Sequence, residues 1–273
     1  MRRRLFILYG FYGFGVTLFF AFVLFPGNEA ALSVRDLWNR HVPDAKLRLE
    51  SVSPTLPVAL AFEEAAVLFG KGGTKKIAFD TLRLEPDFLS LLQGYAAVRL
   101  SAETFGGLFS GRVRPSGRLT LQGPVSADLT VRDLDLDALN RADLLRGRSL
   151  SGLMNGKFSF QGLPGRVPEG EGTAAFDLKN GSIGLYGNVL GLSVLSFDRL
   201  EGLCSLRDRT VSVEKVVFSG SQITGSFQGN IYLTRDLERS RLALTGTIRI
   251  PPLNRDVATV IGGTASVPTV RLR

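Results

Sequence analysis

RLALTGTIRI, residues 241–250, is the stretch that decides the fold class of this chain. Its apolar residues Leu242, Leu244, Ile248 and Ile250 alternate with polar or small residues. A period of two is typical of a β-strand with one face packed on apolar groups and the other in water. We therefore expect a strand that belongs to an antiparallel sheet, because such sheets often bury a single face.

The same alternation recurs along most of the chain. Residues 125–132 and 174–179 repeat it, and glycine- or proline-containing turn signals separate the runs. The sequence predicts a mainly β protein with a long curled antiparallel sheet, built as a half-barrel or two-layered groove, and a few short helices. The side chains expected to line its apolar side are Leu129, Val131, Phe176, Leu178, Leu242, Leu244, Ile248 and Ile250.

Local signals predict where the strands are interrupted. Asn180-Gly181 stands between two alternating runs and predicts a hairpin turn. Residues 86–94 begin with proline and end with glycine, which favours a short helix. Residues 135–147 carry leucines at helical spacing and favour another. Asp133-Leu134-Asp135 resembles the start of a calcium loop, but Ala138 replaces its required glycine, so we interpret it as a strand end.

The N-terminus predicts a membrane anchor. The cations Arg2, Arg3 and Arg4 precede residues 5–25, an uncharged apolar run. As a helix this run would be about 31 Å long, the thickness of a bilayer's hydrocarbon core. The positive-inside rule keeps the arginines in the cytoplasm and the rest of the chain on the other side. The residues expected to contact lipid include Leu5, Phe6, Phe14, Leu18, Phe19, Phe20, Phe22, Leu24 and Phe25.

These signals divide the chain into four parts: a cytoplasmic N-terminus (1–4), an anchor (5–25), a membrane-proximal helix (26–43) and a β domain (44–273). A cleaved signal peptide is the alternative for the anchor, although the run is longer than the usual signal core of about 7–15 residues. The membrane-proximal helix places Trp38 either at the bilayer interface or against the β domain.

Composition argues against catalysis, metal binding and nucleic-acid binding. The net charge is +8, and removing the three leading arginines leaves 8 − 3 = +5, spread along the chain. The densest basic cluster, Arg112, Arg114 and Arg118, lacks aromatic neighbours and is interpreted as a solvated strand end. One cysteine, Cys204, and one histidine, His41, leave little for a metal site or a nucleophile. We expect no cofactor, no catalytic residue and no enzyme activity.

Three segments resemble the AsmA-like family of periplasmic β-proteins anchored in the inner membrane. Residues 150–162 are similar to the family's paired-strand motif, residues 176–183 to its hairpin motif, and residues 262–272 to its terminal strand. The length, the anchor and residues 216–244 resemble, more narrowly, type II secretion system protein N in its AsmA-like form.

The resemblance implies a non-enzymatic accessory or scaffold subunit of a type II protein secretion system. Its expected location is the bacterial inner membrane, as a single-pass protein with most of the chain in the periplasm. The expected partners are the membrane and other secretion subunits, reached through exposed strand edges. The alternative is a lipid-binding or lipid-transfer module of the envelope that holds phospholipid acyl chains in the groove. No nucleic acid is expected.

Overall fold

We describe the fold from a computed structural model. It describes residues 9, 12–13, 16–17, 19–20, 22–42, 45–55, 59–69, 75–87, 89–90, 93–95, 97–116, 123–142, 144, 149–163, 166–189, 192–221, 223–234, 236–250 and 255–272. Among them, nothing helical is both long and apolar enough to cross a bilayer. Ten of the 21 residues of the predicted anchor lie outside this set, and so do Arg2, Arg3 and Arg4.

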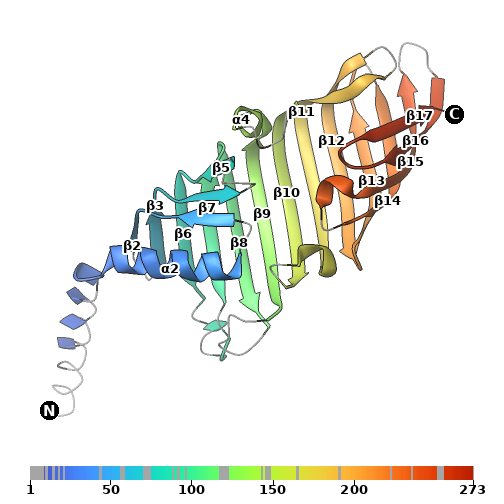
Figure 1. The fold of residues 1–273 in the computed structure, drawn as a ribbon. Helices are drawn as coiled ribbons and strands as arrows, with labels where there is room; N and C mark the ends of the chain where they lie inside the picture. The colour runs from blue at the N-terminus through green and yellow to red at the C-terminus, as the bar shows by residue number, and fades with distance from the viewer. Residues whose placement is uncertain are drawn as a thin grey trace.

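One large antiparallel sheet dominates the described part of the chain (Figure 1). From β7 to β16 each strand pairs with the strands before and after it in the sequence, whereas β6 pairs with β3 and β7. In spatial order its fourteen described strands are β17 (Pro268–Leu272), β16 (Arg255–Gly263), β15 (Arg241–Ile250), β14 (Thr224–Tyr232), β13 (Thr210–Ser219), β12 (Leu192–Arg207), β11 (Glu171–Val189), β10 (Leu150–Gly162), β9 (Val125–Asp135), β8 (Gly107–Pro115), β7 (Val98–Thr104), β6 (Thr81–Pro86), β3 (Ala59–Glu63) and β2 (Ser51–Thr55).

A smaller sheet and a few short helices complete the described structure. The small sheet has the order β1 (Ala45–Arg48), β4 (Ala66–Phe69) and β5 (Lys75–Ala78). The helices with stated bounds are α2 (Gly27–His41), α4 (Leu136–Arg141) and the 3₁₀ turns η2 (Val167–Glu169) and η3 (Leu237–Arg239). The described residues between 9 and 23 and residues 89–90, within the helix predicted over 86–94, are helical as well. The prediction of a mainly β protein with a large antiparallel sheet is therefore confirmed.

Helix α2 packs on the first strands of the large sheet. Ala31 is buried and contributes to a core with Val52 of β2 and Phe62 of β3. The indole Nε1 of Trp38 donates a hydrogen bond of 2.9 Å to the carbonyl oxygen of Ala45. Of the two positions left open for Trp38, the structure favours the one against the β domain.

Helix α4 starts where β9 ends. The carboxylate of Asp135 accepts a hydrogen bond of 2.9 Å from the backbone N–H of Asp137, as an N-cap residue does. Leu136 on the first turn is buried in the central core. The interpretation of the Asp133–Asp135 stretch as a strand end is thus confirmed, and the predicted helix over 135–147 is shorter than expected.

The hairpin predicted at Asn180-Gly181 is wrong. Both residues lie inside the long strand β11, where Asn180 has a φ of 50°. The pairing of β10 with β11 shifts between Ser151 and Leu153 at this point, so an extra residue is accommodated as a β-bulge. Asparagine tolerates the left-handed backbone of a bulge as well as that of a turn, so the local signal did not distinguish the two.

Candidate functional site: the two faces of the sheet

Strand register places apolar side chains on one face of the sheet from end to end. For example, Phe158 of β10 pairs with Leu129 of β9 and with Ala174 of β11. Residues that pair directly across neighbouring strands share a face, and so does every second residue along one strand. We call this the apolar face; its members include Val52, Phe62, Leu84, Leu100, Phe109, Leu129, Val131, Phe158, Phe176, Leu178, Leu200, Val213, Phe218, Phe227, Leu242, Leu244, Ile248, Ile261 and Val270.

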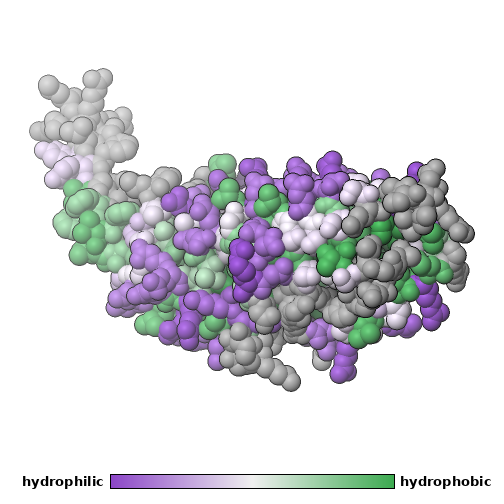
Figure 2. All heavy atoms as spheres, turned by 90° about the horizontal axis from the view of Figure 1, so that it is seen from above, coloured by the Kyte–Doolittle hydropathy of each residue, from purple (hydrophilic) through white to green (hydrophobic). Residues whose placement is uncertain are grey.

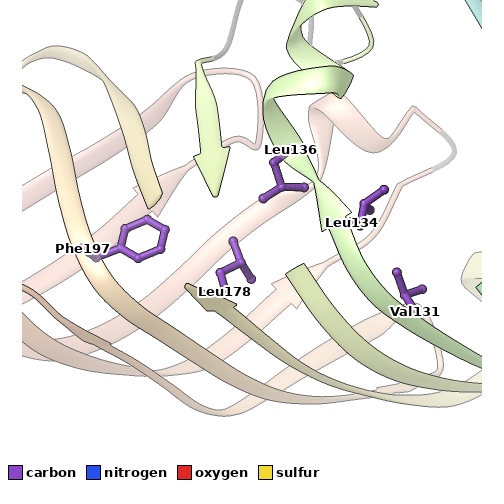
Figure 3. Packing of buried hydrophobic residues seen from close by; sticks show 5 residues of the cluster. All are labelled: Val131, Leu134, Leu136, Leu178 and Phe197. Carbon is purple, nitrogen blue, oxygen red and sulfur yellow. The ribbon is translucent and has the colours of Figure 1, made fainter. Parts of the chain in front are cut away.

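The structure brings the predicted groove residues to this face. Val131 and Leu178 are buried in the central core, and Leu129 and Phe176 pack against it. Figure 3 shows Val131 and Leu178 with the other buried residues of this core, Leu134, Leu136 and Phe197. Further along, Ile248 is buried beside Phe218 and Ile223, and Leu242 and Leu244 are half-buried. Ile250 ends β15, and its side chain lies outside the described set.

Helices cover only part of the apolar face. Helix α2 covers its start, and α4 packs against β10. Strands β13 to β17 make no extensive contact with any other described helix or strand except their neighbours in the sheet. At the last strand Val270 and Leu272 are 38% and 43% exposed. Among the described strands, only the edge strand β17 of the apolar face is therefore exposed, whereas Val213, Phe218 and Ile248 on the strands before it are buried.

Aromatic rings on the apolar face lie over glycines of the next strand. Phe176 pairs with Gly202, Phe218 with Gly225, and Phe227 with Gly246. A Cβ added to any of these glycines would meet ring atoms at under 3.0 Å. The rings of Phe218 and Phe227 are nearly parallel, with an interplanar angle of 12° and centroids 6.1 Å apart. The rings therefore fill the space that side chains at these three positions would occupy.

The opposite face, which we call the polar face, carries ion pairs between adjacent strands. Arg199 of β12 contacts Asp177 of β11 at 2.7 Å and Glu201 of its own strand at 2.6 Å. These carboxylates raise the pKa of Arg199, the hydrogen bond with Asp177 being the largest cause. At the far end Arg249 makes a two-pronged contact with Asp256, with hydrogen bonds of 2.6 and 2.9 Å. Hydrophilic residues line much of one long border of the molecule in Figure 2.

A buried ion pair lies where β6 leaves the sheet, and the sequence did not reveal it. Asp87 is 4% exposed and forms a charged hydrogen bond with Arg112, while Arg99 lies 3.7 Å from its second oxygen. Ser90 accepts a hydrogen bond of 2.8 Å from Arg112. Burial opposes ionisation of Asp87, but the two arginines and hydrogen bonds from Ser90 outweigh it and lower the pKa of the carboxyl. The strand-end interpretation of the basic cluster holds in part: Arg112 and Arg114 lie near the end of β8 with side chains 39% and 48% exposed, but Arg112 also anchors the chain after β6. Arg118 lies outside the described residues.

The single cysteine behaves as a small apolar residue. Cys204 lies on the apolar face between Ala174 and Val213 and is half-buried. Burial, and secondarily the charge of Glu214, raise the pKa of its thiol. A raised pKa leaves little thiolate at neutral pH, which disfavours a nucleophilic role.

Within the described ranges no three His, Cys, Asp or Glu side chains gather as a metal site would require.

The predicted anchor residues are only partly described. Leu5, Phe6, Phe14 and Leu18 lie outside the described set. Four of the others, Phe19, Phe20, Phe22 and Leu24, are between 42% and 71% exposed, whereas Phe25 packs against the core beneath α2. Their contact with lipid stays a prediction.

Comparison with known proteins adds no relative: no family model, no curated protein sequence and no solved structure matches this chain.

Proposed function

We propose that this chain is a non-enzymatic accessory or scaffold subunit of a type II protein secretion system. In this proposal a single span over residues 5–25 holds it in the bacterial inner membrane, and the β domain lies in the periplasm. The proposal starts from the resemblance of residues 150–162, 176–183, 216–244 and 262–272 to the AsmA-like family. The observation in its favour is the open sheet itself, whose two chemically distinct faces and exposed edge strand β17 offer a large contact surface.

The finer architecture belongs to the same proposal. The sheet would curl lengthwise into a half-barrel, with the apolar face as its inner side and α4 at one rim. Leu129, Val131, Phe176 and Leu178 would then line the middle of the groove, and Leu242, Leu244, Ile248 and Ile250 its distal part.

Deleting the gene from a strain that secretes enzymes by this route tests the function. We expect the secreted enzymes to accumulate in the periplasm, and the full-length chain expressed in trans to restore secretion. A periplasmic protein that does not use the secretion system serves as the control and should keep its level and location. Unchanged secretion in the deletion strain would refute the proposal.

Topology is tested separately by fusion. Alkaline phosphatase folds into an active enzyme outside the cytoplasm, so a fusion after the β domain should be active, and replacing Arg2, Arg3 and Arg4 with glutamate should reduce that activity. An inactive C-terminal fusion would contradict the periplasmic location.

A second candidate function, lipid binding or transfer, is favoured by one observation. Val270 and Leu272 on the edge strand β17 are exposed and offer aliphatic contact area at the end of the apolar face. Mass spectrometry of lipids that copurify with the full chain distinguishes the two candidates. Stoichiometric phospholipid that survives delipidating washes, together with normal secretion in the deletion strain, would favour the lipid role.

A further inference from the structure

The polar face contains a shallow basin of about 530 Å³ over the middle of the sheet. It is centred on one row of residues in direct register: Thr130, Lys157, Ala175, Leu203 and Lys215 on strands β9 to β13. Ala175 is short and Leu203 is 44% exposed, so the floor is apolar between two lysines. The volume falls in the range of about 300–1,000 Å³ that is common for ligand sites.

The charges around the basin are not balanced. Its two carboxylates, Asp177 and Glu201, are already paired with Arg199, which lies outside the lining. Its three cations, Arg132, Lys157 and Lys215, make no hydrogen bond or ion pair with any described residue. An anion bound there would gain contacts without breaking an existing pair.

Two β-bulges border the basin. On β9, Arg132 and Asp133 together face Asn155, and Asp133 has a φ of 52°. On β13, Glu214 is an extra residue between Val213 and Lys215 in the pairing with β12. Bulges change the direction of neighbouring side chains and are frequent beside functional sites. Arg132 and Lys215, the cations at opposite sides of the lining, are thus the residues next to the bulges.

We infer that this basin binds an acidic peptide segment of a partner protein. Lys157 and Lys215 are three strand spacings apart, about 14 Å at 4.8 Å per strand. In an extended peptide, residues i and i+4 are about 13 Å apart and share a face with residue i+2. A segment with the pattern acid-x-apolar-x-acid therefore reaches both lysines and places its apolar side chain on Ala175 and Leu203.

A peptide fits the basin better than a membrane or a nucleic acid. Both of those present dense, continuous negative charge, whereas the basin offers three separate cations interspersed with the carboxylates of Asp177, Glu201 and Glu214. A peptide carries separate carboxylates and amide groups. Thr130 and Asn155 on the basin wall can hydrogen-bond with such amides.

Binding is measured with the full chain purified in a mild detergent. The probe is the synthetic peptide acetyl-Ser-Glu-Ser-Leu-Ser-Glu-Ser-amide, and its matched control replaces both glutamates with glutamine. We expect the acidic peptide to bind, the control to bind at least fivefold more weakly, and affinity to fall as salt is raised from 0.05 to 0.5 M. The double variant Lys157→Ala/Lys215→Ala should lose roughly tenfold in affinity, since each exposed ion pair contributes modestly.

Two further variants distinguish binding at the basin from non-specific attraction of the peptide to a positively charged protein. Lys76→Ala removes an exposed cation from the small sheet and should bind the peptide like the native chain. Lys157→Arg/Lys215→Arg keeps the charges and should retain binding. No binding at millimolar peptide, or equal loss in Lys76→Ala, would overturn the inference. Binding of phosphatidylglycerol vesicles that depends on Lys157 and Lys215, without peptide binding, would also overturn it in favour of lipid.

The basin would be one contact surface of the secretion subunit proposed above, and its biological role rests on that function. The two can fail separately. If the deletion strain secretes normally while the peptide binds, the proposed secretion function is refuted and the inference of a peptide-binding basin is supported. If deletion blocks secretion but the peptide does not bind, the inference of a peptide-binding basin is refuted and the proposed secretion function is supported.

Discussion

Phe176 of β11 lies against Gly202 of β12, in the space that any other residue would fill with its Cβ. The contact links the two strands on the apolar face although Gly202 itself has no side chain. Phe218 with Gly225 and Phe227 with Gly246 repeat it on later strands. Aromatic rings that cover cross-strand glycines are a known way to stabilise a sheet where glycine alone would weaken it.

Gly202→Ala should therefore destabilise the fold. The methyl group would meet the ring of Phe176 at under 3.0 Å, and overpacking of this kind typically lowers the free energy of unfolding by about 1–3 kcal/mol. Urea denaturation followed by circular dichroism measures the change. Gly262→Ala is the matched control, because the nearest atom to its new Cβ would be 3.5 Å away. Gly202→Ala combined with Phe176→Leu should recover part of the loss, and no recovery would argue against the ring as the cause.

Asp87→Asn should destabilise the domain at neutral pH, because it leaves the buried end of Arg112 without its charged partner. The pKa of Asp87 is lowered in the folded chain, so ionised Asp87 contributes stability above the unfolded-state pKa. That contribution is lost as the pH falls through the lower, folded-state pKa. Unfolding curves of the native chain and the variant should hence differ at pH 7 and converge at low pH.

Asp256→Asn provides the control for this comparison. The pKa of Asp256 is also lowered, chiefly by its hydrogen bond with Arg249, but both side chains of that pair are more than half exposed. Exposed pairs contribute little to stability, so this variant should unfold almost like the native chain. Equal effects of the two substitutions would contradict a special role for the buried pair.

Glu64→Gln should stabilise the turn between β3 and β4 at neutral pH. A hydrogen bond with Glu64, together with the charge of Glu64, raises the pKa of Glu50. A raised folded-state pKa contributes stability below the unfolded-state value and loses it as the pH rises through the folded-state value. Thermal unfolding at pH 7 and pH 3.5 tests this, with Glu103→Gln as an exposed-carboxylate control. A gain at pH 3.5 larger than the gain at pH 7 would refute the explanation.

Cys204 should react slowly with iodoacetamide in the folded chain. Burial and the charge of Glu214 raise the pKa of the thiol, and the thiolate is the reactive form. In the double variant Cys204→Ala/Ser226→Cys the thiol moves to an exposed position on the polar face and should react faster. Mass spectrometry over a time course at pH 7.5 compares the two rates. A native rate equal to that of the exposed thiol would show that Cys204 is accessible.

Much of the sheet could be predicted from local periodicity. The alternation in residues 241–250 predicts β15 and also the face on which Leu242, Leu244 and Ile248 lie, because side-chain direction in a strand depends only on parity. The same alternation in residues 125–132 and 174–179 predicts parts of β9 and β11. Asn180 shows the limit: its backbone preference suits a turn and a bulge equally, and only the pairing of β10 with β11 decides between them.

The features that depend on distant pairing could not be predicted. Asp87 follows β6 and Arg112 lies on β8, so the whole of β7 separates them in the sequence, and nothing in the neighbourhood of Arg112 in the sequence indicates its carboxylate partner. The basin on the polar face likewise requires the register of five strands. Lys157 and Lys215 are ordinary solvated lysines in the sequence and become neighbours of one apolar floor only when β10 to β13 are aligned.

The strand order has a consequence for how such a chain can change in length. Since each strand from β7 to β16 pairs only with the strands before and after it in the sequence, removing or duplicating one hairpin in this part would leave the remaining pairings intact. Both surfaces would then become narrower or wider by two strands, or about 10 Å, with their chemistry preserved. Homologous chains with more or fewer hairpins could therefore span different distances while keeping the same packing between neighbouring strands.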